Sequence, residues 1–126
     1  GVAFRADAPA DVIARLASDE SYDVMAGLGR NPQVGESLLA RIAWHENPDV
    51  RRSVILNPKA PPAVLKPLLD DPYPFNRAML AGHPALPNNV RRYLFDDPEP
   101  QVRFIAAQML ARRYDEAVDG DQDTRA

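Results

Sequence analysis

The fold of this chain is decided by residues 57–69, which read Asn57-Pro58-Lys59-Ala60-Pro61-Pro62-Ala63-Val64-Leu65-Lys66-Pro67-Leu68-Leu69. The same outline recurs 26 residues upstream, from Asn31-Pro32, and 26 residues downstream, from His83-Pro84. A fixed period in this range, without gaps, is the sequence signature of a repeat array. We therefore predict a stack of about four repeats of this length.

The second half of each repeat predicts a short helix, termed helix B, with its apolar residues at helical spacing. Proline stands near its start at Pro9, Pro61 and Pro87, where a missing N–H costs nothing. Pro67 falls late in its copy, so we expect that helix to be short, kinked or partly 3₁₀. The apolar positions of helix B are Val34, Ala60 and Leu86; Val12, Leu38, Val64 and Val90; and Leu16, Ile42, Leu68 and Leu94.

The first half of each repeat predicts another helix, termed helix A. It ends at Asn31-Pro32, Asn57-Pro58 and His83-Pro84, because a residue before proline disfavours helical geometry. Its buried face is predicted from positions that are equivalent between repeats. These positions are Val24, Val50, Asn76 and Val102; Leu28, Val54, Leu80 and Ala106; and Gly29, Ile55, Ala81 and Ala107.

The last copy departs from the pattern. The expected stop would fall at Met109-Leu110, but Gln101–Val118 reads as one longer helix that covers the end of the stack. We predict a single array over residues 1–118, with a half repeat from residue 5, full repeats from about 19, 45 and 71, and a cap over 97–118. Residues 119–126 contain little apolar character and predict a disordered tail.

Composition excludes several classes of function. The 126 residues carry a net charge of −3, which gives no overall attraction to nucleic acid or an acidic membrane. The absence of cysteine excludes disulfides and thiolate chemistry, and it is compatible with the cytoplasmic location that we expect. No apolar run approaches the roughly 20 residues needed to span a bilayer. No glycine-rich phosphate loop or nucleophile elbow is present, so we expect no catalytic residue and no cofactor.

One repeat unit resembles the leucine-rich repeat variant family, and the resemblance extends over roughly residues 5–108. It is carried by Asp49-Val50-Arg51-Arg52-Ser53-Val54-Ile55-Leu56-Asn57-Pro58 and Pro61-Pro62-Ala63-Val64-Leu65, with Pro98, Gln101-Val102-Arg103, Asn31-Pro32 and Leu38-Leu39. The resemblance implies an all-α, right-handed solenoid of stacked α and 3₁₀ helices. A family member with an iron–sulfur cluster uses cysteines outside its repeats, so no cluster is implied here. The family has no shared enzymatic activity to transfer, and we predict that the chain is not an enzyme.

Arg51, Arg77 and Arg103 occupy equivalent positions, and neighbouring helices pack roughly 8–10 Å apart. One reading is a track that binds phosphates or carboxylates, because guanidinium forks suit both anions. The other reading is structural, with Asp71 and Asp97 capping helix A and pairing with arginines of the same or the adjacent repeat. Both readings predict a ladder of arginines.

Three aromatic residues stand where the other repeats carry polar ones. Trp44 is equivalent to Ser18 and Asp70, Tyr73 to Asn47, and Phe75 to Asp49. Exposed aromatic side chains are typical anchors of protein interfaces. The alternative is that the three pack on one another as a lid over the neighbouring repeat.

The histidines, His45 and His83, fall in different positions of the repeat and do not predict a metal site. His83 takes the place of Asn31 and Asn57, which predicts a capping role in the turn. The interpretation is a non-enzymatic scaffold that binds a protein or peptide through Trp44, Tyr73 and Phe75. Two alternatives remain: binding of a nucleic-acid backbone through Arg51, Arg77 and Arg103, and a structural or regulatory module of a longer protein.

Overall fold

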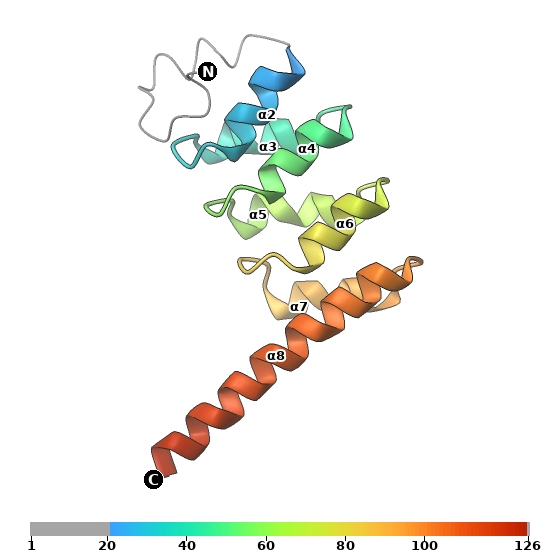
Figure 1. Ribbon diagram of the computed structural model, residues 1–126. Coiled ribbons are helices and arrows are strands. Elements are labelled where there is room, and N and C mark those ends of the chain that lie inside the picture. The colour runs from blue at the N-terminus through green and yellow to red at the C-terminus, as the bar shows by residue number, and fades with distance from the viewer. Residues whose placement is uncertain (1–20, 126) are drawn as a thin grey trace.

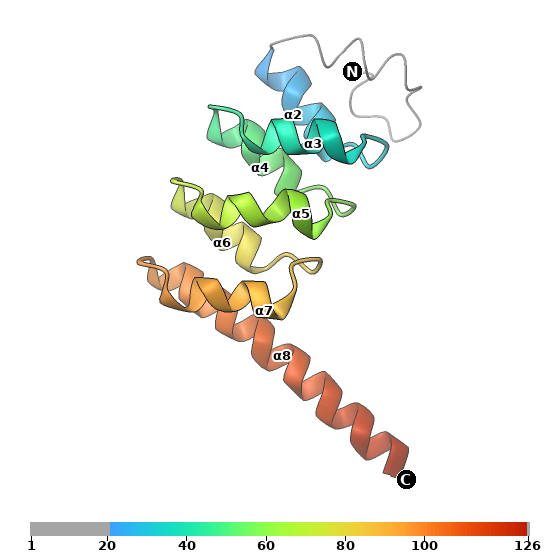
Figure 2. The ribbon, with the colours of Figure 1, turned by 180° about the vertical axis from the view of Figure 1, so that it is seen from behind.

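The structure is a computed structural model that describes the backbone of residues 21–125 and the side chains of residues 21–112. Two layers of helices run along the array, one seen from each side (Figures 1 and 2). The layer of helix A contains α2 (Tyr22–Arg30), α4 (Pro48–Ile55), α6 (Pro74–Ala81) and α8 (Pro100–Arg125). The layer of helix B contains α3 (Glu36–Ala43), α5 (Pro62–Leu65) with η2 (Lys66–Asp70), and α7 (Asn88–Arg91) with η3 (Arg92–Asp96).

Residues 21–125 contain no β-strand, so the prediction of an all-α solenoid built from repeats is confirmed. The right-handed sense of the superhelix stays a prediction. The predicted half repeat, with its helix over Pro9–Ala17, lies outside the described residues.

Prolines and their preceding residues set the bounds of helix A. Pro48, Pro74 and Pro100 each stand at the start of such a helix, where proline's fixed φ fits and its missing N–H is not needed. The helices α2 and α4 end at the predicted stops before Pro32 and Pro58. Proline therefore starts three of the four described A helices, and an X–Pro pair follows the end of α2, α4 and α6.

Of the three described copies of helix B, the second and the third change from α to 3₁₀ geometry, at Lys66 and at Arg92. The first change agrees with the prediction from Pro67, whereas the third copy has Tyr93 in the equivalent position and tightens in the same way. Proline is therefore not required for the tighter turn. In both copies the 3₁₀ segment directs one leucine into the core, Leu68 at 2% exposure and Leu94 at 0%.

The predicted apolar positions form the core. Buried residues occupy every described repeat at the positions of Leu28, Ile42 and Val34. They lie between the two layers in a large cluster and in a smaller one at the C-terminal end, and Leu69 packs against both. The two ends of the array are less buried than the internal repeats at equivalent positions. Val24 in α2 is only partly buried and Ala107 in α8 is exposed. Each internal repeat is thus buried by its neighbours on both sides, as a stack requires.

The longer C-terminal helix is present and extends further than the sequence predicts. The helix α8 continues to Arg125, so residues from Asp119 onward are helical where we expect a disordered tail. The physical reason lies in the sequence, which contains no proline after Pro100 to stop the helix. A single glycine, Gly120, costs only about 1 kcal/mol in a helix interior.

The first two A helices come into very close contact. A Cβ atom built on Gly29 of α2 would lie 1.8 Å from the Oγ atom of Ser53 in α4. Ser53 is held in place by its own hydrogen bond to the carbonyl of Val50, at 2.6 Å. Glycine is therefore required at position 29 for α2 and α4 to pack at this distance.

Candidate functional site

The two edges of the array carry different polar chemistry. We call the turns from helix B to helix A, at residues 44–47, 70–73 and 96–99, the ion-pair edge. We call the turns from helix A to helix B, at residues 31–35, 57–61 and 83–87, the amide edge. Figures 1 and 2 show these two sets of turns on opposite sides of the stack.

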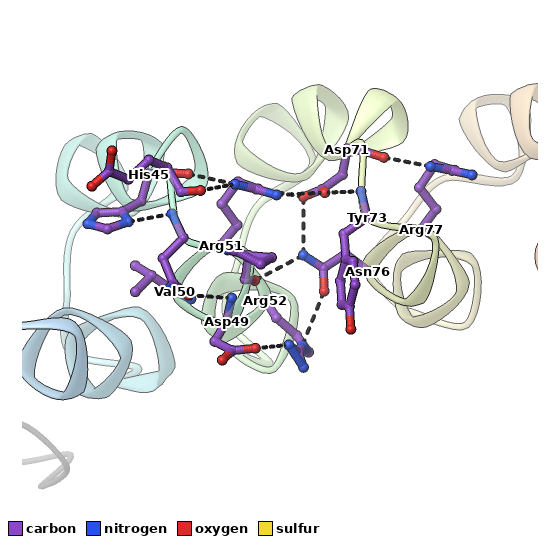
Figure 3. Close-up of polar contacts among 12 residues, drawn as sticks. His45, Asp49, Val50, Arg51, Arg52, Asp71, Tyr73, Asn76 and Arg77 are labelled. Atoms are coloured by element: carbon purple, nitrogen blue, oxygen red, sulfur yellow. Dashed lines mark hydrogen bonds and ion pairs between the residues drawn. The ribbon is translucent and has the colours of Figure 1, made fainter.

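Arg51 and Asp71 form the first contact of the ion-pair edge. The Nε and Nη2 atoms of Arg51 donate to the two carboxylate oxygens of Asp71 at 2.8 and 3.0 Å. Nη1 of the same guanidinium donates to the carbonyls of His45 and Glu46 at 2.8 and 2.9 Å (Figure 3). One arginine therefore joins the turn of its own repeat to the turn of the next repeat.

The next repeat reproduces this geometry. Arg77 donates from Nε and Nη2 to Asp97 at 2.7 and 3.2 Å, and from Nη1 to the carbonyl of Asp71 at 2.7 Å. Arg103 makes the equivalent bond to the carbonyl of Asp97 at 2.6 Å, but no carboxylate of the described residues pairs with it. The three arginines form the predicted ladder, and the ion pairs follow the structural reading.

Hydrogen bonding keeps the two aspartates ionised. Burial alone would raise the pKa of the Asp71 carboxyl, but bonds from Arg51, the N–H of Tyr73 and Asn76 outweigh burial and lower it below 3.8. The pKa of Asp97 is lowered in the same way by Arg77 and the N–H of Glu99 against the effect of burial. Each carboxylate thus closes the turn that leads into helix A, through the N–H of the residue just before the helix, and pairs with the preceding repeat. The predicted capping of helix A itself is not observed for α6, which has no side-chain cap bond.

The opposite edge is held by neutral groups. Asn57 lies fully buried and donates from Nδ2 to the carbonyls of Gly29 and Asn31 at 2.9 and 3.2 Å. Its Oδ1 atom accepts from the N–H of Lys59 at 2.9 Å, which closes the turn. The ring of His83 takes the equivalent place, with Nε2 3.4 Å from the carbonyl of Asn57 and Nδ1 accepting from the N–H of Ala85. The capping role predicted for His83 is confirmed.

Burial lowers the pKa of His83 below its ordinary value of 6.5, against the opposing hydrogen bond to the carbonyl of Asn57. The nearby charge of Arg91 lowers this pKa further. His45 lies on the other edge, where Nδ1 accepts from the N–H of Asn47 at 3.0 Å and the ring meets Tyr22 edge-on. The described residues contain no group of three side chains suited to hold a metal ion.

Sequence reasoning missed the role of Arg91. It stands where the earlier copies of helix B carry Leu39 and Leu65, and it is just as buried, at 1% exposure. Its Nε and Nη2 atoms donate to the carbonyls of Ala81 and His83 at 2.8 and 2.5 Å. The signal was a charged residue in an apolar position of the repeat. Arg91 binds the end of α6 from within the core.

Two of the three predicted aromatics lie together. The rings of Tyr73 and Phe75 meet edge-on with centroids 6.5 Å apart. The guanidinium of Arg52, from the preceding repeat, lies 5.8 Å from the first ring centroid and 5.0 Å from the second. Its Nε atom donates to Oδ1 of Asn76 at 3.1 Å, which orients the planar group (Figure 3). Both rings remain half-exposed, so this contact does not bury them.

Trp44 is the most exposed large apolar side chain of the described residues, at 74%. It follows the last residue of α3 on the ion-pair edge, in the connecting turn before the one that contains Tyr73. The carboxylates on this edge that take no part in the arginine ladder are also exposed; they are Glu46, Asp70, Asp96 and Glu99. Trp44 therefore lies on an edge whose exposed charges are mainly acidic.

A cleft of about 420 Å³ lies between the last two turns of the ion-pair edge. Its lining includes Leu69, Pro72 and Pro98 together with the carboxylates of Asp70 and Asp96. The hydroxyl of Tyr93, another exposed aromatic that the sequence analysis did not single out, donates to Asp70 at 2.6 Å. The cleft combines apolar walls with carboxylates, and Arg77, which pairs with Asp97, also lines it.

The fold and these edges define the class of protein: a helical-repeat array that presents a long surface. Residues 48–72 match the model of the leucine rich repeat variant family. The chain thus carries a repeat of this family, as the sequence resemblance indicates. No curated protein and no solved structure matches the chain. None of the helices in the described part of the chain combines the length and apolar character that crossing a membrane requires.

Proposed function

We propose that the chain is a non-enzymatic scaffold in the cytoplasm that binds a protein segment along its ion-pair edge. The segment would combine apolar side chains with lysine or arginine. The observation that carries the proposal is the exposure of Trp44 and Tyr73 on consecutive turns of an edge with acidic groups. A helical-repeat family supports the scaffold role, because such arrays present extended binding surfaces.

The internal repeats support this choice of residues. Trp44 and Tyr73 occupy positions where other repeats fold with Asp70 and Asn47, so the fold itself does not require an aromatic there. Large exposed aromatics lose apolar contact with water when a partner covers them, and they are enriched among the residues that dominate binding energy. The half-exposed rings of Tyr73 and Phe75 are also held in place by Arg52, which reduces the entropy that binding would cost.

The charges favour a basic partner over a nucleic-acid backbone. The forks of Arg51 and Arg77 already hold carboxylates, so a phosphate would have to displace Asp71 and Asp97. The exposed acidic groups of the same edge would repel a polyanion, whereas they attract lysine and arginine. The cleft at Asp70 and Asp96 can accept one such side chain between apolar walls.

The test is selection of peptides from a random display library, followed by fluorescence anisotropy of the selected peptides. We expect peptides that combine an aromatic or aliphatic anchor with basic residues. Trp44→Ser and Tyr73→Asn restore residues found in other repeats, and each should weaken binding about tenfold or more. Both should change the free energy of unfolding by less than about 0.5 kcal/mol, since the side chains are exposed.

The matched control is Asn89→Ala, an exposed change on helix B that should leave binding unaltered. Peptides bound equally well by wild type and both aromatic variants would contradict the proposed surface. Binding of DNA or RNA at low salt, reduced by replacing Arg51, Arg77 and Arg103, would favour the nucleic-acid alternative instead.

A further inference from the structure

The last two turns of the ion-pair edge are bridged by a guanidinium of the chain itself. Arg77 donates from Nη1 to the carbonyl of Asp71 at 2.7 Å, in the turn of residues 70–73 (Figure 3). Its Nε and Nη2 atoms donate to the carboxylate of Asp97 at 2.7 and 3.2 Å, in the turn of residues 96–99. These two turns therefore lie close enough together for one guanidinium to bind both of them.

The cleft of about 420 Å³ lies between the same two turns. The residues that directly precede the partners of Arg77 are Asp70 and Asp96, and both contribute exposed carboxylates to the lining. The arginines of the ladder neutralise Asp71 and Asp97, whereas no lysine or arginine of the described residues forms an ion pair with Asp70 or Asp96. The cleft therefore has one uncompensated carboxylate on each turn.

Tyr93 adds an aromatic wall to the cleft. Its ring is 58% exposed, and its hydroxyl donates to Oδ1 of Asp70 at 2.6 Å, which holds the two side chains together. This bond and the charge of Asp70 raise the pKa of Tyr93 above its ordinary value, so the hydroxyl keeps its proton. Pro72 and Pro98 supply further apolar surface. A side chain that fits here has a cationic head and a stem that covers apolar surface.

Arginine meets these requirements better than lysine does. A guanidinium has donors on more than one edge, so it can bind a carboxylate on each turn, whereas the ammonium of lysine is a compact point charge. Arg77 already binds the same two turns in this way. The planar group also stacks on an aromatic ring, and Tyr93 provides one.

The preceding position along the edge has different chemistry. In the repeat, Trp44 takes the place of Asp70, and Pro67 takes the place of Tyr93. An apolar position, with Trp44 at 74% exposure, thus precedes the acidic cleft by one repeat. Neighbouring helices pack roughly 8–10 Å apart and an extended chain advances about 3.3 Å per residue, so one repeat corresponds to about three residues of a bound segment.

We infer that the cleft binds an arginine side chain of the partner segment, about three residues from the apolar side chain that contacts Trp44. Asp70 and Asp96 accept hydrogen bonds from the guanidinium, and the ring of Tyr93 covers its face. The inference rests on the peptide binding proposed above. It adds which basic side chain is bound and where that side chain lies in the segment.

The cleft is first tested alone, by nuclear magnetic resonance titration of the isotope-labelled chain with Nα-acetyl-arginine amide. We expect the amide signals of Asp70, Tyr93 and Asp96 to shift. The citrulline analogue, which keeps the shape without the charge, should leave them unchanged, and the lysine analogue should bind more weakly. Asp70→Asn and Asp96→Asn should each weaken arginine binding about threefold, the effect of an exposed ion pair.

The matched control is Glu99→Gln, which removes the same charge from the turn of Asp96 but lies outside the cleft. It should leave arginine binding unchanged. Circular dichroism checks that the variants fold. Equal shifts with arginine and citrulline, or an equal effect of Glu99→Gln and Asp96→Asn, overturn the inference.

Peptides selected by display on the wild-type chain then test the position of the arginine. We expect it about three residues from the apolar anchor, and its replacement by citrulline should weaken binding to the wild type but not to Asp70→Asn. Weaker binding to Trp44→Ser without any effect of Asp70→Asn would keep the peptide-binding surface and overturn the arginine site. Arginine bound in the cleft without any selected peptide would support the arginine site and contradict the proposed scaffold function.

Discussion

The two edges of this array join the same helices with different chemistry. On the ion-pair edge, Arg51 and Arg77 reach across to ionised Asp71 and Asp97. On the amide edge, Asn57 and His83 make the contacts between repeats with neutral groups. The charged pairs are partly open to solvent at the arginine, whereas Asn57 is completely enclosed. The ion pairs thus lie where water still reaches the arginine, whereas the contacts of Asn57 are enclosed and neutral, because an enclosed charge costs far more than an enclosed amide. Arg91 is the exception, since its guanidinium is enclosed and is bound by the carbonyls of Ala81 and His83.

The largest effect is expected on the ion-pair edge. Asp71→Ala removes the acceptor of Arg51, of the N–H of Tyr73 and of Asn76. We expect a loss of about 3 kcal/mol in unfolding free energy, because a partly buried guanidinium loses its counter-ion. Urea denaturation monitored by circular dichroism measures it. The control is Asp70→Ala, the exposed neighbour; an equal loss there would show that the pair with Arg51 is not the cause.

The second-largest loss of unfolding free energy is expected on the amide edge. Asn57→Ala leaves the carbonyls of Gly29 and Asn31 without their bonds from Nδ2 and opens the turn at Lys59. We expect a loss of about 2 kcal/mol, the cost of unsatisfied buried polar groups. The same denaturation experiment applies, with the exposed Asn89→Ala as control. A loss below about 0.5 kcal/mol would mean that water replaces the amide and that this edge is not enclosed.

The two edges should respond to acid in different pH ranges. His83 has a lowered pKa, so its contribution is present above 6.5 and is lost as the pH falls through the value in the folded state. Asp71 and Asp97 also have lowered pKa values, so the stability that their carboxylates contribute is lost only as the pH falls below 3.8. His83→Asn restores the residue of the other repeats and should remove the first of the two decreases in stability. Unfolding free energies measured from pH 8 to pH 3 check this, and an unchanged profile in the variant would contradict it.

The smallest effect is expected where the ion-pair edge ends. Arg103→Ala should change the unfolding free energy of the isolated chain by less than about 0.5 kcal/mol, because this exposed arginine lacks a carboxylate partner among the described residues. Arg51→Ala, at the equivalent internal position, should cost several times more. The same denaturation assay compares the two variants directly. Arg51 has both an ion pair and bonds to turn carbonyls, whereas Arg103 has only a bond to a turn carbonyl. Equal losses would therefore show that the ion pair contributes little to stability.

Periodicity explains which parts of this structure the sequence could predict. The core at Leu28, Val54 and Leu80 and the stops at Asn31 and Asn57 recur in each copy, so several positions support each inference. Arg91 occurs once in its position, and only the packed structure shows that its guanidinium donates to the carbonyls of Ala81 and His83. The contact of Arg52 with Tyr73 and Phe75 also joins residues that are unique to their repeats. Features that break the period depend on side-chain geometry, which the spacing of residues does not contain.

The candidate sites show the same division. Equivalent positions predicted that Arg51 and Arg77 form a ladder and that Asp71 and Asp97 pair with it, but left open which repeat supplies the partner. The exposure of Trp44 required the folded chain, because an aromatic in a polar position can equally turn inward. The binding of a partner by Trp44, Tyr73 and Phe75 remains a prediction.

The close approach at Gly29 has a consequence for the curvature of the array. Gly29, Ile55 and Ala81 occupy one position of helix A, and their side chains differ in volume from nothing to four carbons. Since helices pack to a constant density, unequal volumes at equivalent contacts require unequal spacings or tilts between successive A helices. We therefore expect α2 and α4 to approach most closely at the glycine, where no side chain separates them. One side chain per repeat can therefore change the spacing of successive A helices and, through it, the curvature of the array.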